Sequence, residues 1–183
     1  VPFRAPTTPA VILLRALQEP APTAPAYETI TISAESEFEA CGVADFDNDG
    51  DLDIASGDTW YEAPDWTRHP VSPIRAVGGY RVDFADVPLD IDSDGWIDLV
   101  SCSWHDRAVF WRRNPGPEGG EWKTHEVDRP GNMETAIAAD IDSDGQLDFL
   151  PNVMGRTLWY RIESGELTPH LISNERGGHG IGL

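Results

Sequence analysis

Short apolar runs, separated by turns rich in Gly, Pro, Asn and Asp, make up most of the hydrophobic pattern of this chain. Runs such as Ile97–Cys102 and Leu147–Leu150 are too short for helices, and the apolar positions show almost no helical periodicity. Short runs bounded by turn residues are typical of β-strands. The pattern therefore predicts an all-β chain from about residue 27 onward.

The predicted strands fall into three repeats, because one acidic segment of nine residues occurs three times. The copies read DFDNDGDLD, DIDSDGWID and DIDSDGQLD, and they begin at Asp45, Asp90 and Asp140. A strand-like stretch precedes each copy, and an apolar run, an aromatic pair and a segment with a His-x-aliphatic ending follow it. Repeats of this length with four antiparallel strands each are typical of β-propeller blades.

We expect the repeats to span about residues 33–72, 73–128 and 129–172, and residues 173–183 to begin a further blade. A closed propeller has about four to eight blades. The sequence therefore predicts three complete blades of a larger propeller, with the remaining blades in the same longer chain. An open array, or a ring completed by other copies, is the alternative. Residues 1–26 are predicted to be a Pro/Ala-rich linker or the remnant of a signal peptide.

Composition narrows the classes of protein further. Of the 183 residues, 40% are hydrophobic and 25% are charged, which is typical of a globular chain. A formal net charge of −19 repels phosphate backbones and argues against a nucleic-acid partner. No run of eighteen apolar residues occurs, so no membrane span is predicted. Two cysteines are too few for a disulfide scaffold, and Cys41 and Cys102 are expected to be buried free thiols.

Thirteen of the 32 acidic residues lie in the three repeated segments, which predicts a cation-binding loop in each. The pattern D-x-D-x-D-G-x-x-D offers carboxylates at positions 1, 3, 5 and 9 and a backbone carbonyl at position 7. Oxygen ligands in a flexible ring suit Ca²⁺, and the glycine allows a sharp turn. The expected ligands of about three Ca²⁺ ions are Asp45, Asp47, Asp49, Asp51, Asp53, Asp90, Asp92, Asp94, Trp96, Asp98, Asp140, Asp142, Asp144, Gln146 and Asp148.

An EF-hand or a dockerin loop fits the flanking sequence less well. Both have flanking helices, and an EF-hand also has a glutamate at position 12. Position 12 is Ser56, Ser101 or Pro151 here, and strand-forming residues follow position 9. We therefore expect each loop between the first and second strands of a blade.

Histidines and tryptophans also recur in the repeats. His69, His125 and His170 fall in separate outer strands, too far apart to share a metal ion, so a hydrogen bond within the blade or a solvated position is expected. The repeated tryptophans are expected to form the core between blades. They are Trp60, Trp66, Trp111, Trp122 and Trp159.

The three repeats resemble the FG-GAP/VCBS repeats of bacterial secreted proteins, which are similar to the blades of the integrin α-subunit propeller. The resemblance covers about residues 27–183 and rests mainly on the acidic loop. It implies a propeller with Ca²⁺ in hairpin loops on one face. It also implies an extracellular, cell-surface or periplasmic location, where loops with dissociation constants of roughly 10⁻⁴ to 10⁻³ M would fill.

A carbohydrate or protein ligand is expected on the face opposite the calcium loops, by analogy with other propellers. Trp, Arg, His and carboxylate side chains together suit a sugar or a uronate. The alternative is that Trp104 packs between blades and that the charges are solvated. The expected residues of this face are Glu39, Asp58, Thr59, Arg81, Trp104, His105, Asp106, Glu134, Arg156 and His179.

Three functions are compatible with these features. The first is a calcium-stabilised adhesion module that binds carbohydrate or protein. The second is the propeller domain of a carbohydrate-active enzyme, of the polysaccharide lyase or sugar dehydratase type, with His105, His179, Arg81 and Glu134 as catalytic candidates. The third is a structural spacer. The sequence favours the first, because no local motif requires catalysis.

Overall fold

The computed structural model describes residues 27–175 and residue 180. The chain divides into two units, Val1–Thr31 and Ile32–Leu183, and the described strands lie in the second unit. The predicted linker or signal-peptide remnant at 1–26 lies outside the described residues, as does most of the predicted further blade at 173–183.

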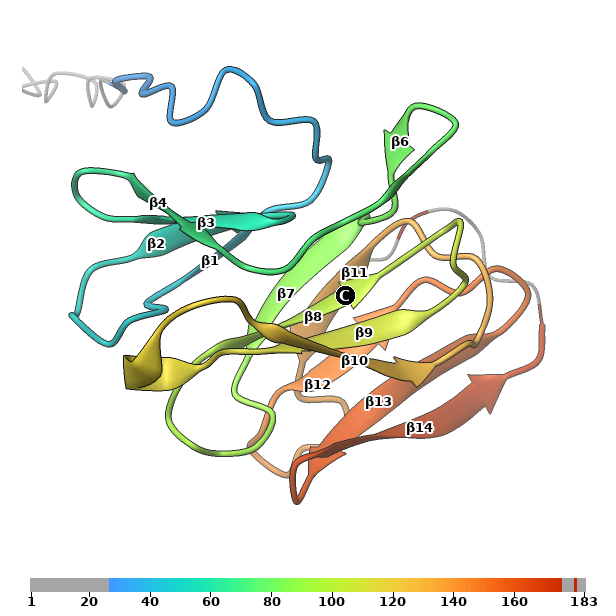
Figure 1. The fold of residues 1–183 in the computed structure, drawn as a ribbon. Helices are drawn as coiled ribbons and strands as arrows, with labels where there is room; N and C mark the ends of the chain where they lie inside the picture. The colour runs from blue at the N-terminus through green and yellow to red at the C-terminus, as the bar shows by residue number, and fades with distance from the viewer. Residues whose placement is uncertain (1–26, 176–179, 181–183) are drawn as a thin grey trace, which may run out of the picture. The chain divides into compact units, whose positions relative to one another are not determined.

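Three antiparallel sheets of four strands each make up most of the second unit (Figure 1). The strands of each sheet pair in the order in which they occur along the chain. The first sheet contains β1 (Gly42–Ala44), β2 (Asp53–Ser56), β3 (Thr59–Glu62) and β4 (Thr67–Pro70). The second contains β7 (Ala85–Leu89), β8 (Asp98–Cys102), β9 (Val109–Arg113) and β10 (Lys123–Asp128). The third contains β11 (Ala136–Ala139), β12 (Asp148–Pro151), β13 (Thr157–Glu163) and β14 (Glu166–Ser173). The prediction of all-β units with four antiparallel strands is confirmed.

A short hairpin and a 3₁₀ turn complete the described elements. The hairpin pairs β5 (Ala76–Val77) with β6 (Tyr80–Arg81) and lies between the first two sheets along the chain. The 3₁₀ turn η1 (Gly116–Glu118) lies between β9 and β10. Within the described residues, no helix has the length and apolar character needed to cross a membrane.

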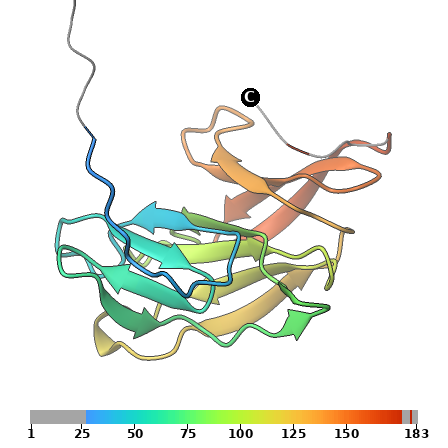
Figure 2. The same cartoon turned by 90° about the horizontal axis from the view of Figure 1, so that it is seen from above.

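The innermost strands of successive sheets lie side by side, because β1 contacts β7 and β7 contacts β11 (Figures 1 and 2). Apolar side chains from both neighbours fill the space between sheets. The first cluster includes Phe46 and Trp60 from the first repeat with Leu99 and Trp122 from the second. The second cluster combines the second and third repeats and includes Val87, Ile91, Val100, Phe149, Leu158 and Tyr160. Neighbouring sheets therefore pack as propeller blades do.

A tryptophan–histidine stack recurs in the outer strands of all three sheets. The ring centroids are 4.3 Å apart for Trp60–His69, 5.0 Å for Trp111–His125 and 4.6 Å for Trp159–His170. Each pair also faces across the third and fourth strands. The repeated histidines therefore stack on the repeated tryptophans. The sequence predicts only a hydrogen bond within the blade or a solvated position for these histidines.

One of the five expected core tryptophans is placed wrongly by the sequence. Trp66 is half-exposed in the turn after β3, with a positive φ of 56°, and it belongs to neither apolar cluster. Trp60, Trp122 and Trp159 are buried, and Trp111 packs against the edge of the second cluster. The error arises because Trp66 and Trp122 both directly precede the fourth strand of their sheet, so their place in the repeat does not separate the half-exposed side chain from the buried one.

A buried arginine joins the first two sheets. Arg112 of β9 donates to Asp83 Oδ1 at 2.9 Å, to Asp86 Oδ1 at 3.2 Å and to the Gly57 carbonyl oxygen at 3.0 Å. Gly57, in the turn between β2 and β3, donates its N–H to Asp86 Oδ2 at 2.9 Å. Burial raises the pKa of Asp83 to about 7, and the charge of Asp86 acts in the same direction. Two carboxylates therefore share one guanidinium between the sheets.

The two cysteines differ in exposure. Cys102 in β8 is buried, as expected, and burial raises the pKa of its thiol. Cys41 is exposed, which corrects the expectation that both thiols are buried. It directly precedes β1 and lies on the same side as the exposed Val43, because residues two apart along an extended chain face the same side.

Candidate functional site

Each aspartate-rich segment forms the loop between the first and second strands of its sheet. These loops are residues 45–52, 90–97 and 140–147, here named loops 1, 2 and 3. Loop 1 contacts loop 2, because Asn48 Nδ2 donates a hydrogen bond to the Gly95 carbonyl oxygen at 3.0 Å. The loops thus lie in β-hairpins, as expected, and not between helices.

The same hydrogen bonds, from backbone N–H groups to aspartate carboxylates, close all three loops. The carboxylate at position 1 accepts the N–H groups of positions 5 and 6 at 3.0–3.2 Å. The carboxylate at position 5 accepts the N–H of position 7 at 2.8–2.9 Å. Position 1 is Asp45, Asp90 or Asp140, position 5 is Asp49, Asp94 or Asp144, and position 7 is Asp51, Trp96 or Gln146. The three loops therefore share one local conformation.

Positive φ angles turn the chain sharply within each loop. The glycines at position 6 have φ values of 85–99°, and the residues at position 4 have φ values of 59–64°. Glycine adopts this region without steric cost, whereas most residues with a Cβ do not. This requirement explains why Gly50, Gly95 and Gly145 recur at the same position.

Three carboxylates in or directly beside each loop lie close enough to hold one cation. Oxygen atoms within each group lie within 4.8 Å of one another, and the groups are Asp45, Asp47 and Asp53; Asp90, Asp92 and Asp94; and Asp140, Asp142 and Asp148. In loop 2, Asp92 Oδ1 is shielded from solvent and has no hydrogen-bond partner among the described residues. Hard oxygen donors with an unsatisfied buried oxygen fit a calcium ion.

The other predicted ligands lie in or beside the same loops but outside these three groups. Those at positions 5 and 7 hold the turn through the hydrogen bonds already described. The remaining one, Asp98, is 1% exposed and accepts hydrogen bonds from the N–H groups of Ile91 and Asn114 and from Trp111 Nε1. The predicted ligands outside the groups are Asp49, Asp51, Trp96, Asp98, Asp144 and Gln146.

The carboxylate at position 9 also has a structural role that the sequence pattern does not indicate. Asp53, Asp98 and Asp148 are at most 1% exposed, and each accepts the N–H of the residue at position 2 at 2.9–3.2 Å. Burial raises the pKa of Asp98 to about 6, and it also raises the pKa values of Asp53 and Asp148. These side chains fix the start of each loop onto the second strand.

The third strand places an arginine beside loops 2 and 3 and a glutamate at the equivalent position of the first sheet. Arg113 of β9 contacts Asp92 and Asp94, and Arg161 of β13 contacts Asp142 and Asp144. The corresponding residue of β3 is Glu62, which pairs with His69. Hydrogen bonds from the Gln146 N–H and from Arg161 lower the pKa of Asp144. The three loops are therefore alike in backbone and different in charge.

Four of the residues expected on the ligand face lie around one hollow of about 570 Å³. They are Glu39, Trp104, His105 and Glu134, and Tyr80 and Phe84 complete its lining. The His105 ring lies 6.0 Å from the ring centroids of both Tyr80 and Phe84. The hollow thus combines aromatic rings with two carboxylates.

The other residues expected on this face lie elsewhere. Arg81 pairs with Glu37 at 2.6 Å, and it lines a separate hollow with Asp58 and Thr59. Arg156 is exposed in the segment between β12 and β13, and His179 lies outside the described residues. Of the four catalytic candidates, the described hollow therefore brings together His105 and Glu134 but not Arg81.

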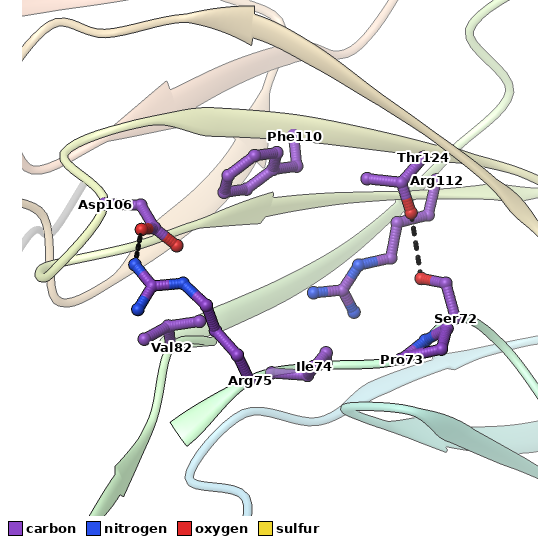
Figure 3. A pocket seen from close by; sticks show the side chains of 9 residues that line it. All are labelled: Ser72, Pro73, Ile74, Arg75, Val82, Asp106, Phe110, Arg112 and Thr124. Carbon is purple, nitrogen blue, oxygen red and sulfur yellow. Dashed lines mark hydrogen bonds and ion pairs between the residues drawn. The ribbon is translucent and has the colours of Figure 1, made fainter. Parts of the chain in front are cut away.

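Asp106, also expected on the ligand face, lines a smaller hollow of about 250 Å³ beside β9 (Figure 3). There it forms an ion pair with Arg75, and Thr124 Oγ1 donates a hydrogen bond to Ser72 Oγ at 2.9 Å. The Arg112 side chain also extends into this hollow in the figure. Asp106 therefore lines this smaller hollow and is not among the residues that line the larger one.

The fold and the loops define a β-repeat protein whose four-stranded units each carry an aspartate-rich hairpin loop. The family model for the FG-GAP-like repeat matches residues 90–150, which include loops 2 and 3. This match confirms the repeat type that the sequence resembles. No curated protein matches the chain significantly.

Several residues of these sites were not predicted from the sequence. Glu62, Arg113 and Arg161 carry no motif of their own, although each lies two residues after a repeated tryptophan, and that spacing could have identified them. Tyr80 and Phe84 had no such signal, since they lie in or just after the β5–β6 hairpin.

Proposed function

We propose that this chain is a calcium-binding β-propeller module in which one Ca²⁺ ion in each of loops 1, 2 and 3 stabilises its blade. The observation that carries the proposal is that each of the three equivalent hairpin loops has a group of three close carboxylates, which always includes positions 1 and 3. FG-GAP-like repeats commonly bind calcium, and the residues that match this family include loops 2 and 3. Position 3 would supply one ligand in each loop, from Asp47, Asp92 or Asp142.

Removing the position 3 carboxylates tests this function loop by loop. Calorimetric titration of calcium into chelator-treated protein is expected to give about three sites. Asp47→Ala, Asp92→Ala and Asp142→Ala should each remove one site, because position 3 belongs to every carboxylate group. Glu166→Gln, which removes an exposed charge outside the loops, should leave the count unchanged. No calcium binding by folded wild-type protein would contradict the proposal.

We also propose a carbohydrate ligand for the hollow around Trp104. Aromatic faces stack on sugar rings, and carboxylates accept hydrogen bonds from hydroxyl or amino groups. The six described residues that line the hollow include two glutamates and no arginine or lysine. This charge disfavours the uronate considered from the sequence and favours a neutral or amino sugar. The lyase or dehydratase alternative has less support, because Arg81 pairs with Glu37 outside this hollow.

Binding of chito-oligosaccharides, with and without N-acetyl groups, tests the ligand class against oligogalacturonate. Trp104→Ala is expected to weaken binding about tenfold through loss of one stacking surface. Trp66→Ala is the matched control, because Trp66 is half-exposed outside the hollow. Preferential binding of oligogalacturonate, or equal effects of the two variants, would contradict the assignment. A location outside the cytoplasm, where millimolar calcium fills weak sites, is part of this proposal.

A further inference from the structure

The third strand of each sheet presents one equivalent side chain to the aspartate-rich loop. Glu62, Arg113 and Arg161 each lie two residues after the tryptophan that stacks on a histidine. The strand registers agree, because each of these tryptophans faces its histidine across the third and fourth strands. The three positions are therefore structurally equivalent, but Arg113 and Arg161 are positively charged and Glu62 is negatively charged.

In loops 2 and 3, the arginine lies on the carboxylates of positions 3 and 5. Arg113 Nε is 2.5 Å from Asp92 Oδ2, and its Nη2 is 3.0 Å from Asp94 Oδ2. Arg161 Nη2 is 2.7 Å from Asp144 Oδ2, and its Nη1 is 3.4 Å from Asp142 Oδ2. The two arginines thus partly neutralise the carboxylates at positions 3 and 5 of loops 2 and 3.

Loop 1 has the opposite arrangement. Its segment carries five aspartates, and Glu62 occupies the place of the arginine. Glu62 Oε2 lies 2.6 Å from His69 Nε2, and Glu62 lines the same hollow as Asp47 of loop 1. Among the described residues, none of the ion pairs involves an aspartate of loop 1.

We propose that Arg113 and Arg161 are internal counter-ions that compete with the cation, so that loop 1 binds calcium more tightly than loops 2 and 3. This inference rests on the calcium-binding function proposed above. A guanidinium within a few ångströms of a divalent ion repels it and occupies its carboxylate oxygens, whereas Glu62 attracts the ion. Loop 1 would therefore fill at low calcium, and the other loops would fill only as the concentration rises.

Each loop can be followed separately through the amide signal of its position 6 glycine in ¹H–¹⁵N NMR spectra of the whole chain. These amides donate to the position 1 carboxylates at 3.0–3.1 Å, so they report on their own loop. In a calcium titration with a buffered chelator, Gly50 is expected to respond at a lower concentration than Gly95 and Gly145. Arg113→Gln should lower the midpoint of Gly95 about tenfold, and Arg161→Gln should do the same for Gly145.

The charge swap Glu62→Arg should raise the midpoint of Gly50 by about tenfold or more. Arg129→Gln is the matched control, because Arg129 pairs with Glu126 on an exposed strand end and should change none of the midpoints. Equal midpoints in the wild type, or an unchanged Gly95 midpoint in Arg113→Gln, would overturn this inference while leaving calcium binding intact. If the glycines do not respond to calcium at all, both the inference and the proposed function are wrong.

Discussion

Saturating calcium is expected to raise the melting temperature of the chelator-treated protein by about 20 °C. A ligand at about 100 times its dissociation constant stabilises a folded protein by about 2.7 kcal/mol per site, so three sites contribute about 8 kcal/mol. For a chain of this size, each kcal/mol shifts the melting temperature by about 2–4 °C. Three divalent ions add six positive charges and reduce the formal net charge from −19 to −13.

Differential scanning calorimetry with and without excess chelator checks this result. Sodium chloride at matched ionic strength separates specific binding from screening of the acidic surface. Magnesium should stabilise the protein less than calcium, because it requires a stricter octahedral geometry. An equal shift in sodium chloride would show that the loops respond to salt and not to a bound ion.

Replacing Arg112 with methionine is expected to destabilise the protein by about 3–5 kcal/mol at pH 8. The substitution keeps much of the side-chain volume but leaves Asp83 and Asp86 buried without their cation, which is the costly way to break a buried ion pair. Urea denaturation in calcium-free buffer measures the change in the free energy of unfolding. Arg129→Met is the matched control, because the Arg129 side chain is 59% exposed and its replacement should leave the free energy of unfolding nearly unchanged.

The loss should shrink as the pH falls from 8 to 5. The pKa of Asp83 is already raised to about 7 in the presence of Arg112, and removing the guanidinium raises it further. When the pKa of a carboxyl is raised in the folded state, protonation of that carboxyl stabilises the folded protein. This stabilisation is lost as the pH rises through the folded-state pKa. A destabilisation that is independent of pH would show that packing, and not charge, is the main contribution of Arg112.

The local features of this fold could be predicted from the sequence, whereas the contacts between strands could not. The nine-residue motif specifies its own turn through Asp45 and Gly50, so the position of each loop follows from a short segment. The side chains beside the loops depend on the pairing of the second and third strands. The turns that join these strands differ in length from sheet to sheet, so the sequence distance from each loop to Glu62 or Arg113 is not constant, although each lies two residues after a repeated tryptophan.

The same limit applies to the residues between the sheets. Asp83, Asp86 and Arg112 are separated in the sequence and lie outside the repeated motif, so their meeting depends on how β7 and β9 lie in one sheet. Part of the lining of the larger hollow could be predicted, because the blade topology places Trp104, His105 and Glu134 on one face. Tyr80 was missed because the β5–β6 hairpin interrupts the repeat.

The contact between Gly57 and the arginine cluster limits how far these repeats can be treated as separable parts. Gly57 of the first repeat both receives a hydrogen bond from Arg112 and donates one to Asp86 of the second. A second repeat expressed without the first would expose this charged cluster and lose two of its hydrogen bonds. Shuffling or excising blades at the boundary between the first two repeats should therefore keep Gly57, Asp86 and Arg112 together, because the two repeats form this cluster jointly.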